Sequence, residues 1–67
     1  MIHLNGQPAD LADDATVADV VARAGGDPGG RGVAVAVDGE VVPRGSWATT
    51  PVAPGARVEV LTAVQGG

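Results

Sequence analysis

The dipeptide Asn5-Gly6 lies between two short apolar runs near the start of the chain. A type I′ turn needs positive φ angles at both central residues, and Asn-Gly is a pair that adopts them readily. Pairing across such a turn places Ile2 beside Ala9, so that one face of the hairpin is apolar. Residues 1–11 are therefore predicted to form a β-hairpin. Its inward face would carry Ile2, Leu4, Ala9 and Leu11.

A second local pattern predicts one short helix over residues 16–24. Thr16 is suited to the N-cap, and Asp19, three residues later, gives a weak form of the capping box. Gly25-Gly26 ends the pattern, because glycine readily adopts the conformation that follows a helix C-terminus. Valine is a poor helix former, so this helix must be held by packing against a sheet. The apolar stripe that would pack there consists of Val17, Val20, Val21 and Ala24.

The second half of the chain is predicted to form three more strands. Asp38-Gly39 is the expected turn of a hairpin over residues 32–42, in which alternating valine and alanine make both faces of the first strand apolar. Residues 44–56 contain prolines and glycines and are expected to form a loop. Alternation returns over residues 57–62, which predicts a last strand with Val58 and Val60 facing inward.

The predicted order of elements is therefore β-β-α-β-β-β within about 60 residues. This order favours an α+β fold of the β-grasp type, a mixed sheet of four to five strands with one helix packed on one face. The first and last strands would pair in parallel at the centre of the sheet. The face opposite the helix would remain open to solvent or to a partner.

The composition excludes several classes of function. The chain of 67 residues has no cysteine, so it can form neither a disulfide nor a thiolate metal site. Four arginines against eight acids give a net charge of −4, which disfavours binding to nucleic acid or to an anionic membrane. An acidic chain is better suited to a basic patch on another protein. No signal peptide or membrane span is recognisable, and a cytoplasmic location is expected.

The glycine-rich segment 25–32 resembles a phosphate-binding loop only superficially. Gly25 and Gly30 have the required separation, but Arg31 and Gly32 stand where a lysine and a hydroxyl residue are needed. The segment also follows the predicted helix, whereas a phosphate loop follows a strand and opens a helix. A flexible connector is the favoured interpretation.

Side chains that could act in catalysis or bind a metal occur without partner residues near them in the sequence. His3 is the one histidine, and it is expected on the outer face of the first hairpin, near Pro8. Ser46 has no base near it in the sequence, and no set of metal ligands is evident. The chain is therefore expected to have no catalytic residue and no metal site of its own. Trp47, the single aromatic residue, is expected to fill the core rather than to anchor a partner.

The segment Gln65-Gly66-Gly67 at the C-terminus is the remaining candidate. Two glycines allow the backbone to pass through a narrow channel into the active site of another protein, because they carry no side chains. There the carboxylate of Gly67 could be activated as a mixed anhydride, which makes its carbonyl group attackable. The alternative interpretation is that the C-terminal segment is a frayed tail without function. Residues 1–62 are predicted to be the folded domain and residues 63–67 a flexible tail.

Taken together, these segments resemble the ThiS family of ubiquitin-like sulfur carriers. The match is carried by the helix start at 16–21, by the hairpin and its continuation at 33–44, by Trp47-Ala48 and by the closing run 58–67. One departure is Pro54-Gly55-Ala56, where the family usually has Asp-Gly-Asp. This departure bears on the stability of a loop rather than on the tail.

The resemblance implies a role in the thiazole branch of thiamine biosynthesis. A ThiF-like adenylyltransferase would use ATP to adenylate the carboxylate of Gly67, and a sulfur donor would convert it to a thiocarboxylate. Thiazole synthase, ThiG, would then accept the sulfur. Gly66 and Gln65 would give the tail its reach, and Leu61 would belong to the docking surface. The chain itself would bind no cofactor, since ATP and the sulfur donor are used by the partners.

Other functions stay open on the sequence alone. A related carrier could supply sulfur to molybdopterin or to another sulfur-containing product by the same chemistry. A protein modifier would instead be joined through its C-terminus to lysines of target proteins. A binding module with a frayed end would need no activation of its C-terminus, and removing the tail would then change nothing.

Overall fold

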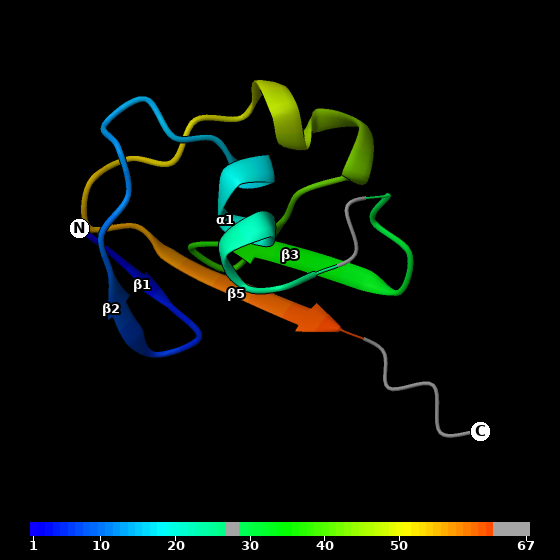
Figure 1. Ribbon diagram of the computed structural model, residues 1–67, viewed down its shortest axis with the longest axis horizontal. Coiled ribbons are helices and arrows are strands. Elements are labelled where there is room, and N and C mark those ends of the chain that lie inside the picture. Colours follow the sequence, from blue (N-terminus) through cyan, green and yellow to red (C-terminus); the bar gives the residue numbers. More distant parts are fainter. Residues whose placement is uncertain (27–28, 63–67) are drawn as a thin grey trace.

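Five short strands form one mixed sheet, and α1 lies across one of its faces (Figure 1). The computed structural model describes residues 1–26 and 29–62. The order of strands in the sheet is β2-β1-β5-β3-β4, so the last strand in the chain occupies the centre. The elements are β1 (Ile2–Leu4), β2 (Gln7–Ala9), α1 (Val17–Arg23), β3 (Val33–Val37), β4 (Glu40–Val41), the 3₁₀ helix η1 (Arg44–Thr49) and β5 (Arg57–Thr62). The predicted β-grasp arrangement is confirmed.

The first hairpin has the predicted turn and register. Asn5 and Gly6 adopt φ angles of 51° and 81°, as a type I′ turn requires. Ile2 pairs with Ala9 across the antiparallel β1–β2 ladder. On its other side β1 runs parallel to β5, with Leu4 opposite Val58. The parallel pairing of the first and last strands at the centre of the sheet is therefore also confirmed.

Helix α1 is short and closed at both ends by local hydrogen bonds. At its start, the backbone N–H of Thr16 donates to Oδ2 of Asp19 over 2.8 Å, as in a capping box. At its end, Gly25 has a φ angle of 79°, and the N–H of Gly26 donates to the carbonyl oxygen of Val21 over 3.0 Å. This is the bond of a Schellman motif. Its inward valines are buried against the sheet, as the apolar stripe predicted.

The second hairpin places β3 between β5 and the two-residue edge strand β4. Asp38 and Gly39 form its turn with φ angles of 50° and 86°. Strand β3 pairs antiparallel with β5 along its whole length, from Val33 opposite Thr62 to Val37 opposite Val58. The interior position of β3 agrees with its apolar character on both faces.

The segment predicted as a loop contains ordered structure, so the prediction for residues 44–56 was wrong in part. Its first half forms η1, which begins with a 2.9 Å hydrogen bond from the N–H of Ser46 to the carbonyl oxygen of Pro43. Its second half bridges to the start of α1, where the N–H of Val52 donates to the carbonyl oxygen of Ala15 over 3.1 Å. These contacts depend on tertiary packing, which local composition does not reveal.

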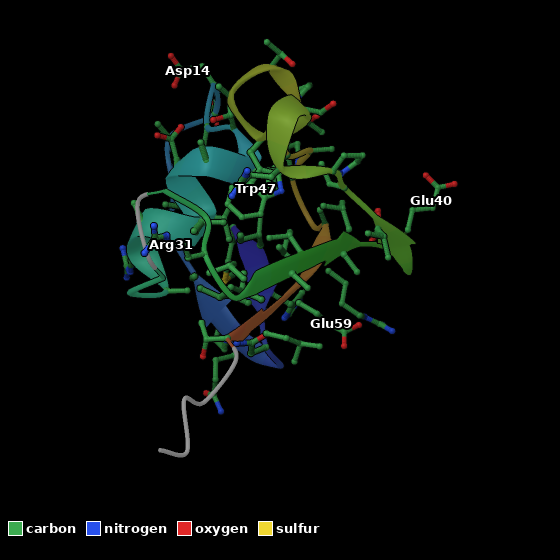
Figure 2. All side chains as sticks on the ribbon, turned by 90° about the vertical axis from the view of Figure 1, so that its right-hand side faces the viewer. Asp14, Arg31, Glu40, Trp47 and Glu59 are labelled. Carbon is green, nitrogen blue, oxygen red and sulfur yellow. The ribbon has the colours of Figure 1, made fainter. Side chains whose placement is uncertain are left out.

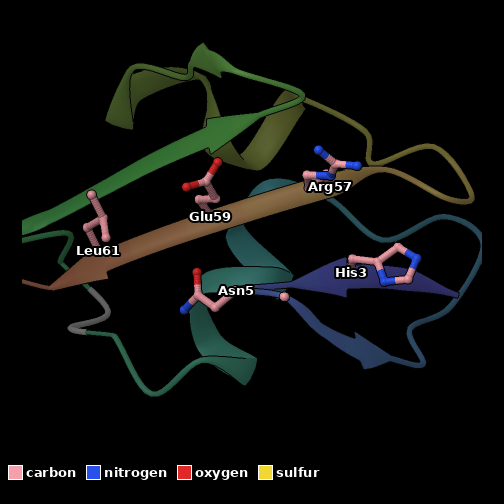
Figure 3. A pocket seen from close by; sticks show the side chains of 6 residues that line it. His3, Asn5, Arg57, Glu59 and Leu61 are labelled. Carbon is pink, nitrogen blue, oxygen red and sulfur yellow. The ribbon is translucent and has the colours of Figure 1, made fainter.

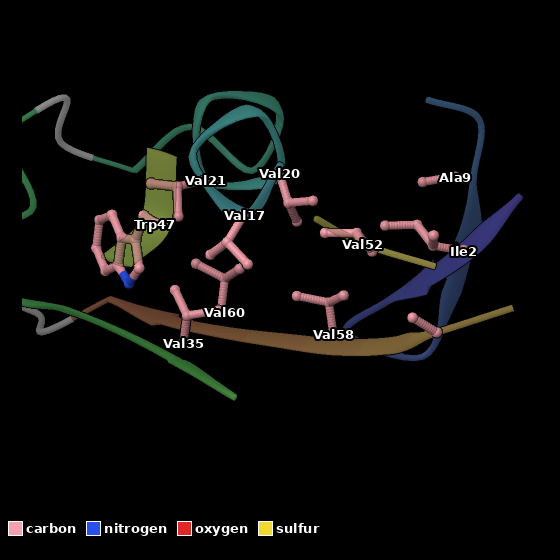
Figure 4. Packing of buried hydrophobic residues seen from close by; sticks show 11 residues of the cluster. Ile2, Ala9, Val17, Val20, Val21, Val35, Trp47, Val52, Val58 and Val60 are labelled. Carbon is pink, nitrogen blue, oxygen red and sulfur yellow. The ribbon is translucent and has the colours of Figure 1, made fainter. Parts of the chain in front are cut away.

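The core between α1 and the sheet is built mainly of valine, with Trp47 inserted from η1 (Figure 4). Trp47 is 6% exposed, and Figure 2 shows its ring directed inward while Asp14, Glu40 and Glu59 project outward. Its predicted role as a core residue is confirmed. The fully buried side chains of largest volume are Val17, Val20, Val35 and Val58.

The described part of the glycine-rich segment passes over this core. Gly30 is buried with a φ angle of 78°, and a Cβ atom there would meet the side chains of Arg44 and Trp47. The segment links α1 to β3 and opens no helix, so its order of elements is not that of a phosphate loop. Close packing at Gly30 makes this part more constrained than the flexible connector that the sequence suggested.

Candidate functional site

The open face of the sheet, opposite α1, is one candidate site. Alternation along β5 sends Arg57, Glu59 and Leu61 to this face, while Val58 and Val60 point into the core. Leu61 is 65% exposed, whereas Val60 next to it is 5% exposed. The central strand therefore presents two opposite charges and one large apolar side chain to the exterior.

A shallow hollow of about 630 Å³ lies along β5 on this face (Figure 3). His3 from β1 and Arg57 from β5 stand at one end of it, since these two residues are register partners in the parallel pair. Leu61 stands at the other end, with Glu59 between. The hollow thus runs from a polar end to an apolar end. It is lined by His3, Asn5, Gly6, Arg57, Glu59 and Leu61.

An apolar patch continues from Leu61 toward the edge of the sheet. A smaller hollow there is lined in part by Leu61, by Val41 of β4 and by two alanines of β3, the exposed Ala34 and the half-buried Ala36. Among the described residues, the large apolar side chains that are exposed are Met1, Val41 and Leu61, and the last two lie in this patch. Exposed apolar side chains grouped on one face are typical of protein contact surfaces. The apolar patch comprises Ala34, Ala36, Val41 and Leu61.

Within residues 1–26 and 29–62, no group of three or more His, Asp or Glu side chains is placed to hold a metal ion. His3 lies on the outer face of β1, as predicted, and pairs in register with Pro8. Over the same residues, no helix has the length and apolar character needed to cross a membrane.

Of the predicted functional residues, Leu61 lies in the described part of the chain, and the other three lie outside it. Leu61 lies on the open face, one residue before the end of β5. Gln65, Gly66 and Gly67 lie outside the described residues, as does the predicted tail 63–67 as a whole. Their roles stay predictions. The structure does show that β5, the central strand, is the element that leads into them.

Sequence reasoning missed two contributors to this face. Val41 joins the apolar patch because it pairs with Ala36 across the second hairpin, a register that the Asp38-Gly39 turn could have indicated. Asn5 lines the main hollow and hydrogen-bonds to β5 through its side chain. Its position in a turn was predicted, but no local signal indicates which distant strand its amide group contacts.

Known proteins resemble this chain in both sequence and structure. The crystal structure of the thiamine biosynthesis protein ThiS from Geobacter metallireducens is 28% identical and has a TM-score of 0.76, with 98% of this chain and 97% of that chain covered. The solution structure of a thiamine biosynthesis protein from the same organism is 29% identical, with a TM-score of 0.79 and coverages of 98% and 86%. No curated protein matches the chain significantly in sequence. The sequence model of the ThiS family matches residues 2–67, nearly the full length, and the chain therefore belongs to the ThiS family.

Proposed function

We propose that this protein is a sulfur carrier of thiamine biosynthesis and that the carboxylate of Gly67 carries the sulfur. Proteins of the ThiS family are small carriers that work with partner enzymes, and the similar Geobacter structures are thiamine biosynthesis proteins. The observation that carries the proposal is the extent of the family match. It covers residues 2–67 and so includes both the folded part and Gly66-Gly67.

In this proposal the chemistry is supplied by partners. The Gly67 carboxylate attacks the α-phosphate of ATP on a ThiF-like adenylyltransferase, and pyrophosphate leaves. Sulfur delivered at the oxidation level of sulfide then attacks the carbonyl carbon of the mixed anhydride, the bond to AMP breaks, and a thiocarboxylate remains at the C-terminus. Thiazole synthase, ThiG, takes the sulfur into the thiazole ring. The chain acts as a co-substrate, and ATP and the sulfur donor bind to the partner enzymes rather than to it.

The open face of the sheet supports this role by offering a docking surface on β5, the strand that precedes the tail in the chain. The apolar patch would supply contact area, and Arg57 and Glu59 at its side would help to fix the orientation of the partner. The net charge of −4 favours encounter with a basic partner surface. Leu61 would be central to docking, because it is exposed and lies on the strand that leads to the tail.

Intact-mass spectrometry tests the proposal directly. The chain is incubated with an adenylyltransferase of this type, ATP and a sulfur donor, and its mass is expected to rise by the difference between one sulfur and one oxygen atom. The mass should stay unchanged without ATP. Deleting Gly67 should abolish the product and leave the circular dichroism spectrum and the unfolding midpoint as they were. An unmodified mass in the complete system would contradict the proposal.

A growth experiment identifies the acceptor. A strain that lacks this protein is expected to need added thiazole, and the full chain should remove that need while the chain without Gly67 should not. If the thiocarboxylate forms in vitro but the strain grows without thiazole, the sulfur goes to another product, such as molybdopterin. Conjugates with other proteins that resist thiol reagents would instead indicate a protein modifier.

A further inference from the structure

The central strand β5 extends beyond the strand that pairs with it on one side. In the described part of the chain, β1 pairs with β5 only at His3–Arg57 and Leu4–Val58, and the chain then turns away. On the other side, β3 stays paired with β5 as far as Thr62. The C-terminal half of β5, which leads to the tail, therefore has a neighbouring strand on one edge only.

Asn5 lies along this free edge of β5, and its side chain hydrogen-bonds there as a neighbouring strand would (Figure 3). The backbone N–H of Asn5 donates to the carbonyl oxygen of Val58 over 2.9 Å. Its Oδ1 atom then accepts the N–H of Val60 at 2.8 Å, and its Nδ2 atom donates to the carbonyl oxygen of Val60 at 3.1 Å. A carboxamide has the same donor and acceptor as a peptide group, so Asn5 continues the ladder by one residue.

The turn of the second hairpin contacts β5 in a related way at its other end. Asp38, like Asn5, is a non-glycine turn residue with a positive φ angle. Its N–H donates to the carbonyl oxygen of Arg57 over 2.8 Å, and its Oδ1 atom accepts the N–H of Arg57 at 3.0 Å. Both turns thus hold the central strand, Asp38 at its first residue and Asn5 near its end. Only Asn5 acts close to the segment that leads into the tail.

We propose that Asn5 is a positioning residue of the sulfur-carrier cycle, an inference that rests on the function proposed above. By fixing Val60, Asn5 holds the end of β5 in one geometry relative to the open face. Leu61 is then oriented for docking, and Thr62, the last described residue before the tail, is held in a defined position. A partner that must bind Leu61 and accept the tail gains from this order, because binding to a preorganised segment costs less entropy.

Three substitutions separate this role from a general effect on stability. Asn5→Gly removes both side-chain hydrogen bonds but keeps the turn, since glycine adopts positive φ angles freely. Asn5→Asp keeps the acceptor for the N–H of Val60 and replaces the donor by an oxygen that faces the carbonyl of Val60. Asp38→Gly is the matched control, because it removes the corresponding side-chain bond at Arg57 and keeps its own turn.

Hydrogen exchange on the isolated chain provides the first readout and is independent of any partner. The protection of the Val60 amide is expected to fall about 10- to 100-fold in Asn5→Gly, the range that corresponds to losing its hydrogen bonds. Asn5→Asp should give a smaller loss. Asp38→Gly should leave Val60 as protected as in the wild type. Unchanged protection of Val60 in Asn5→Gly would overturn the proposal.

The second readout is the activation reaction, followed as ATP–pyrophosphate exchange with the carrier as the varied substrate. Under conditions in which circular dichroism shows every variant to be folded, Asn5→Gly should raise KM by about three- to tenfold and leave kcat unchanged. Asp38→Gly should leave both constants unchanged. Asn5→Asp should show an intermediate KM, and it replaces Asn5→Gly in the comparison if the glycine variant does not fold.

The outcomes distinguish the two levels of the proposal. If the wild-type chain is activated and Asn5→Gly has the wild-type KM, the positioning role is wrong while the carrier function stands. An equal rise in KM for Asn5→Gly and Asp38→Gly would also contradict the positioning role. The rise in KM would then result from a general loss of stability and not from the location of Asn5 beside Val60. If the wild-type chain itself is not activated, the carrier function fails and the positioning role fails with it.

Discussion

The indole nitrogen of Trp47 donates a 2.9 Å hydrogen bond to the backbone carbonyl oxygen of Val42. This bond ties η1 to the residue that follows β4, and the ring itself fills the core. Trp47→Phe keeps an aromatic ring but leaves that carbonyl without its donor. The free energy of unfolding is expected to fall by about 1–3 kcal/mol. Urea unfolding followed by circular dichroism measures the change.

Ala48→Ser is a suitable control for this measurement. Ala48 is exposed and next to Trp47 in η1, so its substitution should change stability by less than about 0.5 kcal/mol. A Trp47→Phe variant as stable as the wild type would show that the hydrogen bond to Val42 contributes nothing.

Gly30 is predicted to tolerate alanine less well than other glycines with a positive φ angle. Its φ angle is 78°, close to the 81° of Gly55, but a Cβ atom at Gly30 meets Arg44 and Trp47 whereas one at Gly55 meets nothing within 4 Å. Both alanine variants should lose about 1–2 kcal/mol for the backbone conformation. Gly30→Ala should lose about 1–3 kcal/mol more, for overpacking.

The thermal midpoints of the two variants, followed by circular dichroism, give the comparison. Adding Arg44→Ala to Gly30→Ala should recover part of the loss, because side-chain carbons of Arg44 are the nearest neighbours of the new methyl group. Equal midpoints for Gly30→Ala and Gly55→Ala would refute the packing argument.

The capping box of α1 should contribute measurably to so short a helix. Asp19→Ala removes the acceptor for the N–H of Thr16, and the expected loss is about 1 kcal/mol in the free energy of urea unfolding. Asp10→Ala, at an exposed site outside the helix, controls for the change in net charge. A loss of the same size in both variants would attribute the effect to charge rather than to capping.

Leu61→Ala tests the docking surface without disturbing the core. Leu61 is 65% exposed, so the free energy of unfolding should change by less than about 0.5 kcal/mol. The value of kcat/KM for activation by the adenylyltransferase should fall about tenfold, as expected for an apolar contact at the centre of an interface.

The matched control for Leu61 is Thr62→Ala, which alters the next residue of β5. Thr62 is also exposed, but alternation directs it to the other side of the strand. Its substitution should leave kcat/KM unchanged. If Leu61→Ala is activated as efficiently as the wild type, the apolar patch does not dock the activating enzyme.

Most of the fold could be predicted because its signals are local. The turn at Asn5-Gly6, the capping residues of α1 and the alternation in β5 each act within a few residues, and each was found where expected. The 3₁₀ helix η1 could not be predicted in this way. Its segment is rich in loop residues, and it is ordered because Trp47 is drawn into a core formed by distant elements.

The candidate site likewise contains some residues that local sequence signals predict and others that depend on distant parts of the chain. Leu61 follows from alternation along one strand, but the hydrogen bonds from Asn5 to Val60 join residues 55 positions apart. A side chain that contacts the backbone of a distant strand leaves no periodic signal in the sequence. Only the register of β1 against β5, established by the whole sheet, brings these two groups together.

The parallel pairing of β1 with β5 also has a consequence for biosynthesis. When the first hairpin emerges from the ribosome, it consists of two strands of three residues each, which is too little to be stable alone. Its inner edge stays unpaired until residues 57–62 have been translated. The middle of the sheet can therefore close only late in synthesis, and shortened nascent chains that stop before β5 cannot fold into this domain.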